Sequence, residues 1–140
     1  MRQLFIDANI LIAVINKEYP LFSNASRVLS LADRKDFDLY TSLACLAISY
    51  YFAEKKSGSA VAKKKIKLIV EHLKIANSGY QEVASTLTNS SMYDFEDGLE
   101  YYTALNAGCD IIVTENIKDF YFSEIEVTDT ASLVKSITKY

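Results

Sequence analysis

Histidine is almost absent from the sequence, which has only His72 among its 140 residues. A Ser-His-Asp triad, a histidine-rich zinc site and a histidine acid–base pair are therefore nearly excluded. The chain also has no tryptophan and a single proline, and 50% of its residues are hydrophobic, a composition typical of one compact domain. We expect a single domain over residues 1–140 whose chemistry, if it is an enzyme, depends on carboxylates.

Cysteines and long hydrophobic runs are also scarce. Cys45 and Cys109 lie in apolar segments, which predicts two buried, reduced thiols rather than a disulfide framework and fits a reducing cytosol. The apolar stretch at residues 4–15 is interrupted by Asp7 and Asn9 and is shorter than the roughly 18 residues that a membrane span needs. We expect a cytoplasmic protein that does not enter a membrane.

The charges are unbalanced and segregated. A net charge of −3 argues against a protein that holds nucleic acid by bulk electrostatics alone. Lysines gather between residues 55 and 67, with no acidic residue among them, and four acids gather between residues 94 and 100. Lys63, Lys64 and Lys67 could follow an RNA backbone or simply form the solvated face of a helix.

Short apolar runs alternate with helical patterns along the chain. Residues 2–6 and 110–113 have the composition and length of buried strands, with weaker candidates at 38–41, 74–76 and 125–127. Such alternation predicts an α/β sandwich with a mainly parallel sheet, in which ligands bind beyond the carboxyl ends of the strands. We expect helices at residues 9–16, 22–34, 42–55, 59–73, 80–88, 94–107 and 130–138.

Acidic and amide side chains recur at the predicted carboxyl ends. Asp7 follows the first strand, and Asn116 and Asp119 follow the strand at residues 110–114. Asp94 and Asp97 open a helix and, three residues apart, share one of its faces. Because carboxyl ends of parallel strands meet at one edge of a sheet, we expect these side chains to lie close together.

Helix capping is an alternative explanation for each acid taken alone. Asp7, Asn9 or Asp94 could be an N-cap, and Asp97 could interact favourably with a helix dipole. Glu96 and Glu100 are expected to project differently around the helix axis. Capping does not require three separate segments to converge, so we favour a functional site.

Clustered carboxylates repel one another and are tolerated when a divalent cation neutralises them. Mg²⁺ and Mn²⁺ prefer oxygen ligands, and Mg²⁺ keeps several waters beside one or two carboxylates. A bound ion of this kind supports hydrolysis of phosphodiester bonds. The sequence therefore predicts a Mg²⁺ or Mn²⁺ site that accepts phosphate.

Three ordered motifs resemble those of the PIN domain family: FIDANILI (residues 5–12), DFEDGL (94–99) and IVTEN (112–116) followed by DF (119–120). The resemblance spans nearly the whole chain. The PIN domain family includes the VapC-type toxins of bacterial toxin–antitoxin pairs. It implies a three-layer α/β/α sandwich around a parallel sheet and a metal-dependent ribonuclease site. The resemblance also implies three partners, namely RNA, an antitoxin protein and a second copy of the chain.

The resemblance also assigns roles. It implies that Asp7, Asp97 and Asp119 are catalytic and hold the metal. Asn116 occupies the place of a further metal ligand that is usually an aspartate, and Asn9, Asp94 and Thr114 are supporting residues, Thr114 through its hydroxyl.

The chain departs from the family pattern at a second acidic position. PIN proteins usually carry a glutamate in the helix after the second strand, and aligning YTSLACLA (residues 40–47) to that pattern places Ala47 there. Glu54 is seven residues further on, about 10 Å along a helix axis. With Asn116 also uncharged, two negative charges are missing, which should weaken metal affinity and catalysis.

The sequence therefore leaves two alternative functions. One is a metal-dependent endoribonuclease of the kind found as the toxin of a type II toxin–antitoxin pair. The other is a catalytically degenerate module of the same fold that binds RNA or a protein partner. Receiver and phosphatase-like α/β domains also place an aspartate after the first strand, but Asp7-Ala8-Asn9 lacks the second aspartate of the phosphatase pattern.

Overall fold

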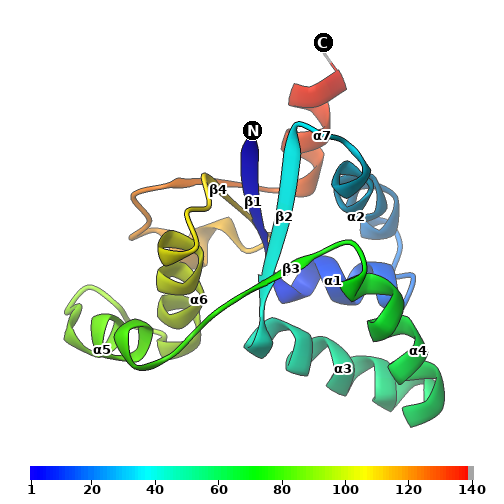
Figure 1. Ribbon diagram of the computed structural model, residues 1–140, viewed down its shortest axis with the longest axis horizontal. Coiled ribbons are helices and arrows are strands. Elements are labelled where there is room, and N and C mark those ends of the chain that lie inside the picture. The colour runs from blue at the N-terminus through cyan, green and yellow to red at the C-terminus, as the bar shows by residue number, and fades with distance from the viewer. Residues whose placement is uncertain (139–140) are drawn as a thin grey trace.

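The computed structural model describes residues 1–138 as a parallel sheet flanked by helices (Figure 1). The strands are β1 (Arg2–Ile6), β2 (Phe37–Ser42), β3 (Lys74–Ala76), β4 (Ile111–Val113) and β5 (Glu126–Thr128). The α-helices are α1 (Ala8–Ile15), α2 (Leu21–Ser30), α3 (Leu43–Ser57), α4 (Ser59–Val70), α5 (Tyr80–Thr88), α6 (Phe95–Asn106) and α7 (Thr130–Thr138). Two 3-10 helices, η1 (Leu31–Asp33) and η2 (Ile117–Phe120), complete the set.

All five strands run parallel, in the order β3-β2-β1-β4-β5. Helices α5 and α6 lie on one side of the sheet, and α1, α2 and α7 lie on the other (Figure 1). The predicted α/β sandwich with a parallel sheet is therefore confirmed. Because β1 is central and pairs with both β2 and β4, the carboxyl ends of these strands meet where α1 and α3 begin.

The central strands are buried on both faces, as their continuous apolar sequence predicts. Leu4, Phe5 and Ile6 of β1 have no exposed surface, and neither do Ile112 and Val113 of β4. Fully burying a side chain of this size contributes about 1.5–3 kcal/mol. These two strands therefore anchor the sheet edge at which the polar residues lie.

Some predicted boundaries shift by a turn or less. The helix expected at residues 22–34 is α2 followed by η1, and the helix expected at residues 59–73 ends as α4 at Val70. The chain turns between α3 and α4 at Gly58, whose φ of 82° lies in the left-handed region that favours glycine. No helix among residues 1–138 combines the length and the hydrophobicity needed to cross a membrane.

Gly98 lets α6 approach α5 closely. A Cβ atom at position 98 would lie 2.6 Å from Cγ2 of Thr86 and 2.7 Å from Cγ of Met92. Thr86 is buried and β-branched, so its side chain has few other rotamers available. The contact therefore requires glycine.

Gly98→Ala should destabilise the protein, although alanine is worth about 1 kcal/mol more than glycine inside an ordinary helix. We expect a loss of about 1–3 kcal/mol, typical of overpacking, measured by urea denaturation. Adding Thr86→Ser removes the Cγ2 atom and should recover part of this loss. A Gly98→Ala variant more stable than the wild type would contradict the close contact.

Candidate metal centre at the carboxyl edge of the sheet

Asp7 joins β1 to α1, and three nitrogen or hydroxyl donors hold its carboxylate. Its Oδ1 accepts from the backbone N–H of Ala8 at 2.7 Å, which makes it the N-cap of α1. Its Oδ2 accepts from the Thr114 hydroxyl at 2.8 Å and from Asn9 Nδ2 at 3.3 Å. The capping and functional interpretations are therefore compatible, because Oδ1 keeps a lone pair that the Ala8 N–H does not use.

Thr114 connects the ends of β1 and β4. It is fully buried, and its Oγ1 accepts from Asn9 Nδ2 at 3.1 Å and from the backbone N–H of Asn116 at 3.0 Å. Asn9 does not cap a helix, because Asp7 has that position. The polar residues that follow the two strands thus form one network behind the Asp7 carboxylate.

The start of α6 brings further acids. Asp94 is the N-cap, and its Oδ1 accepts from the backbone N–H of Asp97 at 3.0 Å. Glu96 and Glu100, which were expected to project differently around the helix axis from Asp94 and Asp97, line the same cavity as these two residues. That cavity has a volume of about 310 Å³. It is lined by Asp7, Ala8, Asn9, Ile12, Ile48, Asp94, Glu96, Asp97, Glu100, Asn116 and Asp119.

We call this cavity the acidic pocket. The predicted residues Asp7, Asp97 and Asp119 all line it, together with Asn116 from the amino end of η2. Three chain segments that are distant in sequence therefore converge, as the strand ends predict. Lys63, Lys64 and Lys67, in contrast, are exposed on α4 and do not line the acidic pocket.

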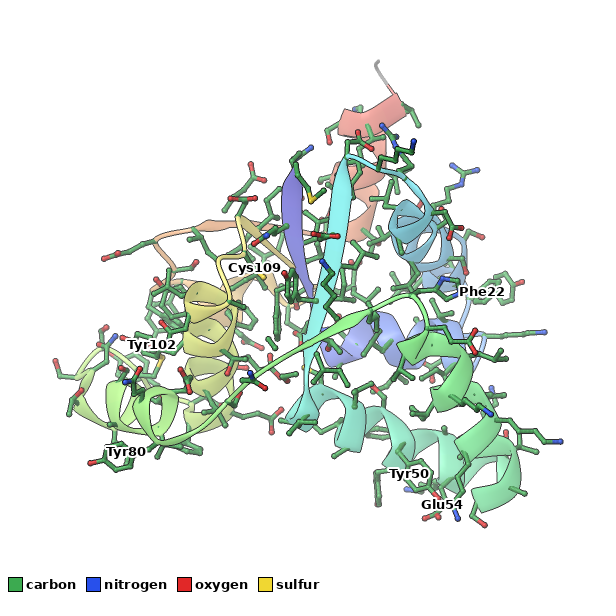
Figure 2. All side chains as sticks on the ribbon, viewed as in Figure 1. Phe22, Tyr50, Glu54, Tyr80, Tyr102 and Cys109 are labelled. Atoms are coloured by element: carbon green, nitrogen blue, oxygen red, sulfur yellow. The ribbon has the colours of Figure 1, made fainter. Side chains whose placement is uncertain are left out.

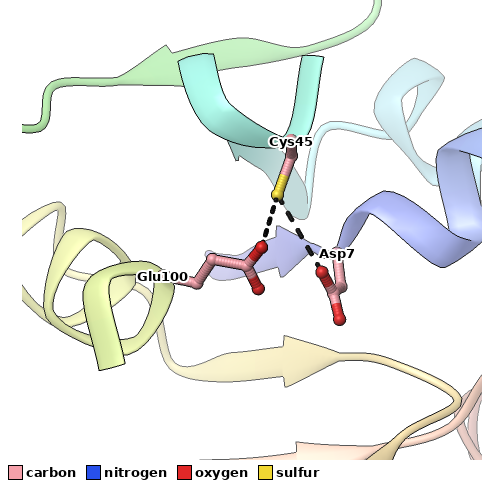
Figure 3. Close-up of side chains that lie close together, drawn as sticks. All are labelled: Asp7, Cys45 and Glu100. Carbon is pink, nitrogen blue, oxygen red and sulfur yellow. Dashed lines mark hydrogen bonds between the residues drawn. The ribbon is translucent and has the colours of Figure 1, made fainter. Parts of the chain in front are cut away.

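Two buried residues beside Asp7 were missed by the sequence reasoning. Glu100 is 3% exposed, and the Cys45 thiol donates to its Oε1 at 3.3 Å and lies 3.9 Å from Asp7 Oδ1 (Figure 3). Glu100 could have been found, because it lies three residues after Asp97 and so shares its helix face. Nothing in the sequence indicates that α3 brings Cys45 to the same place.

The predicted place of the missing family glutamate is also wrong by one residue. Ala47 is exposed, and the α3 residue that lines the acidic pocket is Ile48. One residue is about 100° around a helix, so this offset moves the side chain from the pocket to the solvent. Glu54 does not line the acidic pocket and instead accepts from the Tyr50 hydroxyl at 3.0 Å.

The acidic pocket perturbs the ionisation of its members. Burial, and then the charges of Asp94 and Asp119, raise the pKa of Asp97 to about 7. Burial, and then the charge of Asp7, raise the pKa of Glu100 to about 10. Among residues 1–138, the ion pairs lie elsewhere, and no lysine, arginine or histidine lines the acidic pocket. It therefore concentrates negative charge that no side chain of the described segment neutralises.

This donor set fits a hard divalent cation. The acidic pocket offers carboxylate oxygens from three segments and the amide oxygen of Asn116, which are the ligand types of Mg²⁺ and Mn²⁺. A second cavity, of about 410 Å³, lies between α1, α2 and α4 and is lined by apolar side chains together with lysines, serines and single aspartate and histidine residues. It has no comparable group of oxygen ligands.

Comparison with known proteins agrees with the motifs. The profile of the PIN domain matches residues 3–118. The chain belongs to the PIN domain family. Ribonuclease VapC1 of Aquifex aeolicus (strain VF5) is 29% identical over 136 residues, which cover 91% of this chain and 90% of that protein.

Two solved structures share the fold at low sequence identity. VapBC-1 from nontypeable Haemophilus influenzae has a TM-score of 0.71 at 19% identity and covers 92% of this chain and 98% of its own. VapC20 of Mycobacterium tuberculosis, described as a toxin that cleaves the sarcin-ricin loop, has a TM-score of 0.61 at 14% identity and covers 78% of this chain and 86% of its own. Both confirm the PIN fold.

The metal-free protein should lose stability as the pH rises from 5 to 8. A carboxyl group with a higher pKa in the folded protein than in the unfolded chain binds its proton more tightly when folded. For Asp97 this difference acts between pH 3.8 and about 7, and for Glu100 between pH 4.5 and about 10. The free energy of unfolding, measured with urea in chelator, should therefore fall across this range.

Glu100→Gln should make this pH dependence shallower, because glutamine resembles the protonated acid and does not titrate. The matched control is Glu71→Gln on an exposed residue outside the acidic pocket, which should leave the slope unchanged. A stability that rises from pH 5 to 8, or equal slopes in the wild type and Glu100→Gln, would contradict the perturbed acids.

Proposed function

We propose that this protein is an endoribonuclease that needs Mg²⁺ or Mn²⁺ and is the toxin of a type II toxin–antitoxin pair. The observation that carries the proposal is the acidic pocket, where carboxylates from β1, α6 and η2 converge without a neutralising side chain in the described segment. The curated relative named a ribonuclease, aligned over nearly its whole length, supports RNA as the substrate.

Asp7, Asp97 and Asp119 are the proposed metal ligands, with Asn116 as a neutral fourth. When bound, the ion lowers the pKa of a water and offsets the charge that develops on the phosphate. Thr114 and Asn9 hold Oδ2 of Asp7 through hydrogen bonds of 2.8 and 3.3 Å, which fixes its orientation. Without a cation, the same carboxylates would repel the phosphate backbone of RNA.

The partners of the proposal are RNA, an antitoxin protein and a second copy of the chain. The structural neighbours that are VapBC assemblies support an antitoxin. The exposed lysines of α4 offer contacts to RNA phosphates, although they stand away from the acidic pocket.

A catalytically degenerate binding module is the second candidate, and two residues of the acidic pocket favour it. Ile48 contributes no ligand atom, and Asn116 contributes no charge. Each lost carboxylate lowers the affinity for a divalent cation. Cleavage assays therefore separate the two candidates more directly than binding alone.

Asp97→Asn should reduce Mn²⁺-dependent cleavage of a mixed structured RNA by about 100-fold or more, because losing even a partner of a metal ligand costs 10–100-fold. Asp33→Asn is the matched control, since Asp33 is an exposed aspartate outside the acidic pocket, and it should cleave like the wild type. Equal cleavage by Asp97→Asn would exclude this site, and no cleavage by the wild type would favour the binding module.

Ile48→Glu should tighten Mn²⁺ binding by about tenfold, because it adds a carboxylate to the acidic pocket. Ala47→Glu adds the same charge one residue earlier, on an exposed position, and should change the affinity far less. Calorimetric titration of both variants measures the difference. If Ala47→Glu gained as much affinity as Ile48→Glu, the position assigned to Ile48 would be wrong.

A further inference from the structure

Cys45 introduces a soft ligand beside a group of hard oxygen ligands. Its Sγ, a carboxylate oxygen of Asp7 and one of Glu100 all lie within 4.8 Å of one another, and all three residues are buried. They come from three different elements, namely α3, the end of β1 and α6, and their side chains point toward one another (Figure 3). Among residues 1–138, this is the one group of metal-ligating side chains with such close spacing.

The spacing suits a tetrahedral ion. Zinc binds sulfur at about 2.3 Å and carboxylate oxygen at about 2.1 Å, so tetrahedral geometry separates neighbouring ligand atoms by about 3.5 Å. The Cys45 sulfur lies 3.3 Å from Glu100 Oε1 and 3.9 Å from Asp7 Oδ1. These distances bracket the required value, so an ion could enter with small side-chain adjustments.

Glu100 provides an independent indication that a ligand belongs here. It is 97% buried and lines the acidic pocket, where a carboxylate normally accepts several strong hydrogen bonds. Within residues 1–138, the hydrogen-bond partners of its side chain are the Cys45 thiol and the Asp7 carboxyl, and a thiol is a weak donor. The two partners of Glu100 are thus the other two members of the group, and no donor of the described segment outside the group bonds to its carboxyl oxygens.

Cys45 and Cys109 both pack in the hydrophobic core, but they differ in their polar neighbours. Both cysteines are free and buried, and Figure 2 labels Cys109 close to β4, where it follows α6. Cys109 belongs to no group of metal-ligating side chains within the described segment. It is therefore a matched internal control for Cys45.

We propose that Asp7, Cys45 and Glu100 form a site for a thiophilic divalent cation of the Zn²⁺ class. On binding, the S–H bond of Cys45 and the O–H bond of the protonated Glu100 carboxyl break, metal–sulfur and metal–oxygen bonds form, and both protons pass to solvent. Three protein ligands leave a fourth position for water. The site shares Asp7 with the proposed nuclease centre, so Zn²⁺ should compete with Mg²⁺ for that carboxylate. This competition rests on the proposed function, whereas Zn²⁺ binding at the three residues does not.

Cobalt(II) is the probe, because a cobalt–thiolate bond produces a charge-transfer band in the near ultraviolet. We expect titration of the reduced full-length protein with Co²⁺ to produce this band at one equivalent, and Zn²⁺ to displace Co²⁺ and remove it. The band should persist in Cys109→Ser and disappear in Cys45→Ser. Circular dichroism checks that each variant is folded.

Glu100→Gln provides a second variant that keeps the sulfur. It should weaken Co²⁺ binding on the order of 10- to 100-fold while the band still forms at high Co²⁺. No band in the folded wild-type protein, or a band that survives in Cys45→Ser, would overturn the proposal.

The same titration separates this proposal from the nuclease. Asp97→Asn should keep the cobalt–thiolate band, because Asp97 is not one of the three ligands, while it loses RNA cleavage. A wild-type protein that shows the band but no cleavage would refute the nuclease and support the thiolate site. Cleavage without the band would support the nuclease and refute the thiolate site.

Discussion

Electrostatic repulsion between buried carboxylates is the constraint on which the rest of the site depends. Asp7 and Glu100 place carboxylate oxygens within 4.8 Å of each other, and both residues are buried. Water cannot screen these charges well at such depth. Two responses are available, namely protonation, which the raised pKa of Glu100 reflects, and neutralisation by a cation.

The scaffold supports this arrangement with residues that serve structure and site together. Asp7 is the N-cap of α1 and Asp94 is the N-cap of α6, so the same side chains that begin the helices also line the cavity. Thr114 fixes Asp7 from β4, and Gly98 allows α6 to lie against α5. The position of the acids therefore depends on the core strands β1 and β4, whose apolar side chains are fully buried.

The sequence predicted the parallel sheet and most of the acidic pocket, because both follow from local patterns. Apolar runs identified the strands, and a polar residue directly after a parallel strand must lie at its carboxyl edge. Asp7 and Asp119 could be placed on this basis, and Asp97 by its position at the start of a predicted helix. The PIN motifs gave the same assignment, and the family is confirmed by the profile match.

What could not be predicted depends on helix phase and on contacts between distant segments. The sequence pattern placed Ala47 where Ile48 lines the acidic pocket. The motif has no acid of its own at this point, so nothing in it fixes which residue of the helix faces the pocket. The packing of α3 against the start of α1 and near α6 brings Cys45 to Asp7 and Glu100, a contact between residues 38 and 55 positions apart in the chain. No local pattern reports such a contact.

The central claim is that the acidic pocket binds a divalent cation. Anomalous diffraction from crystals grown with Mn²⁺ tests it most directly, because manganese is located without reference to activity. The account predicts one or more manganese peaks within coordination distance of the carboxylates of Asp7, Asp97 and Asp119. Well-ordered carboxylates at neutral pH with no manganese peak between them would contradict it.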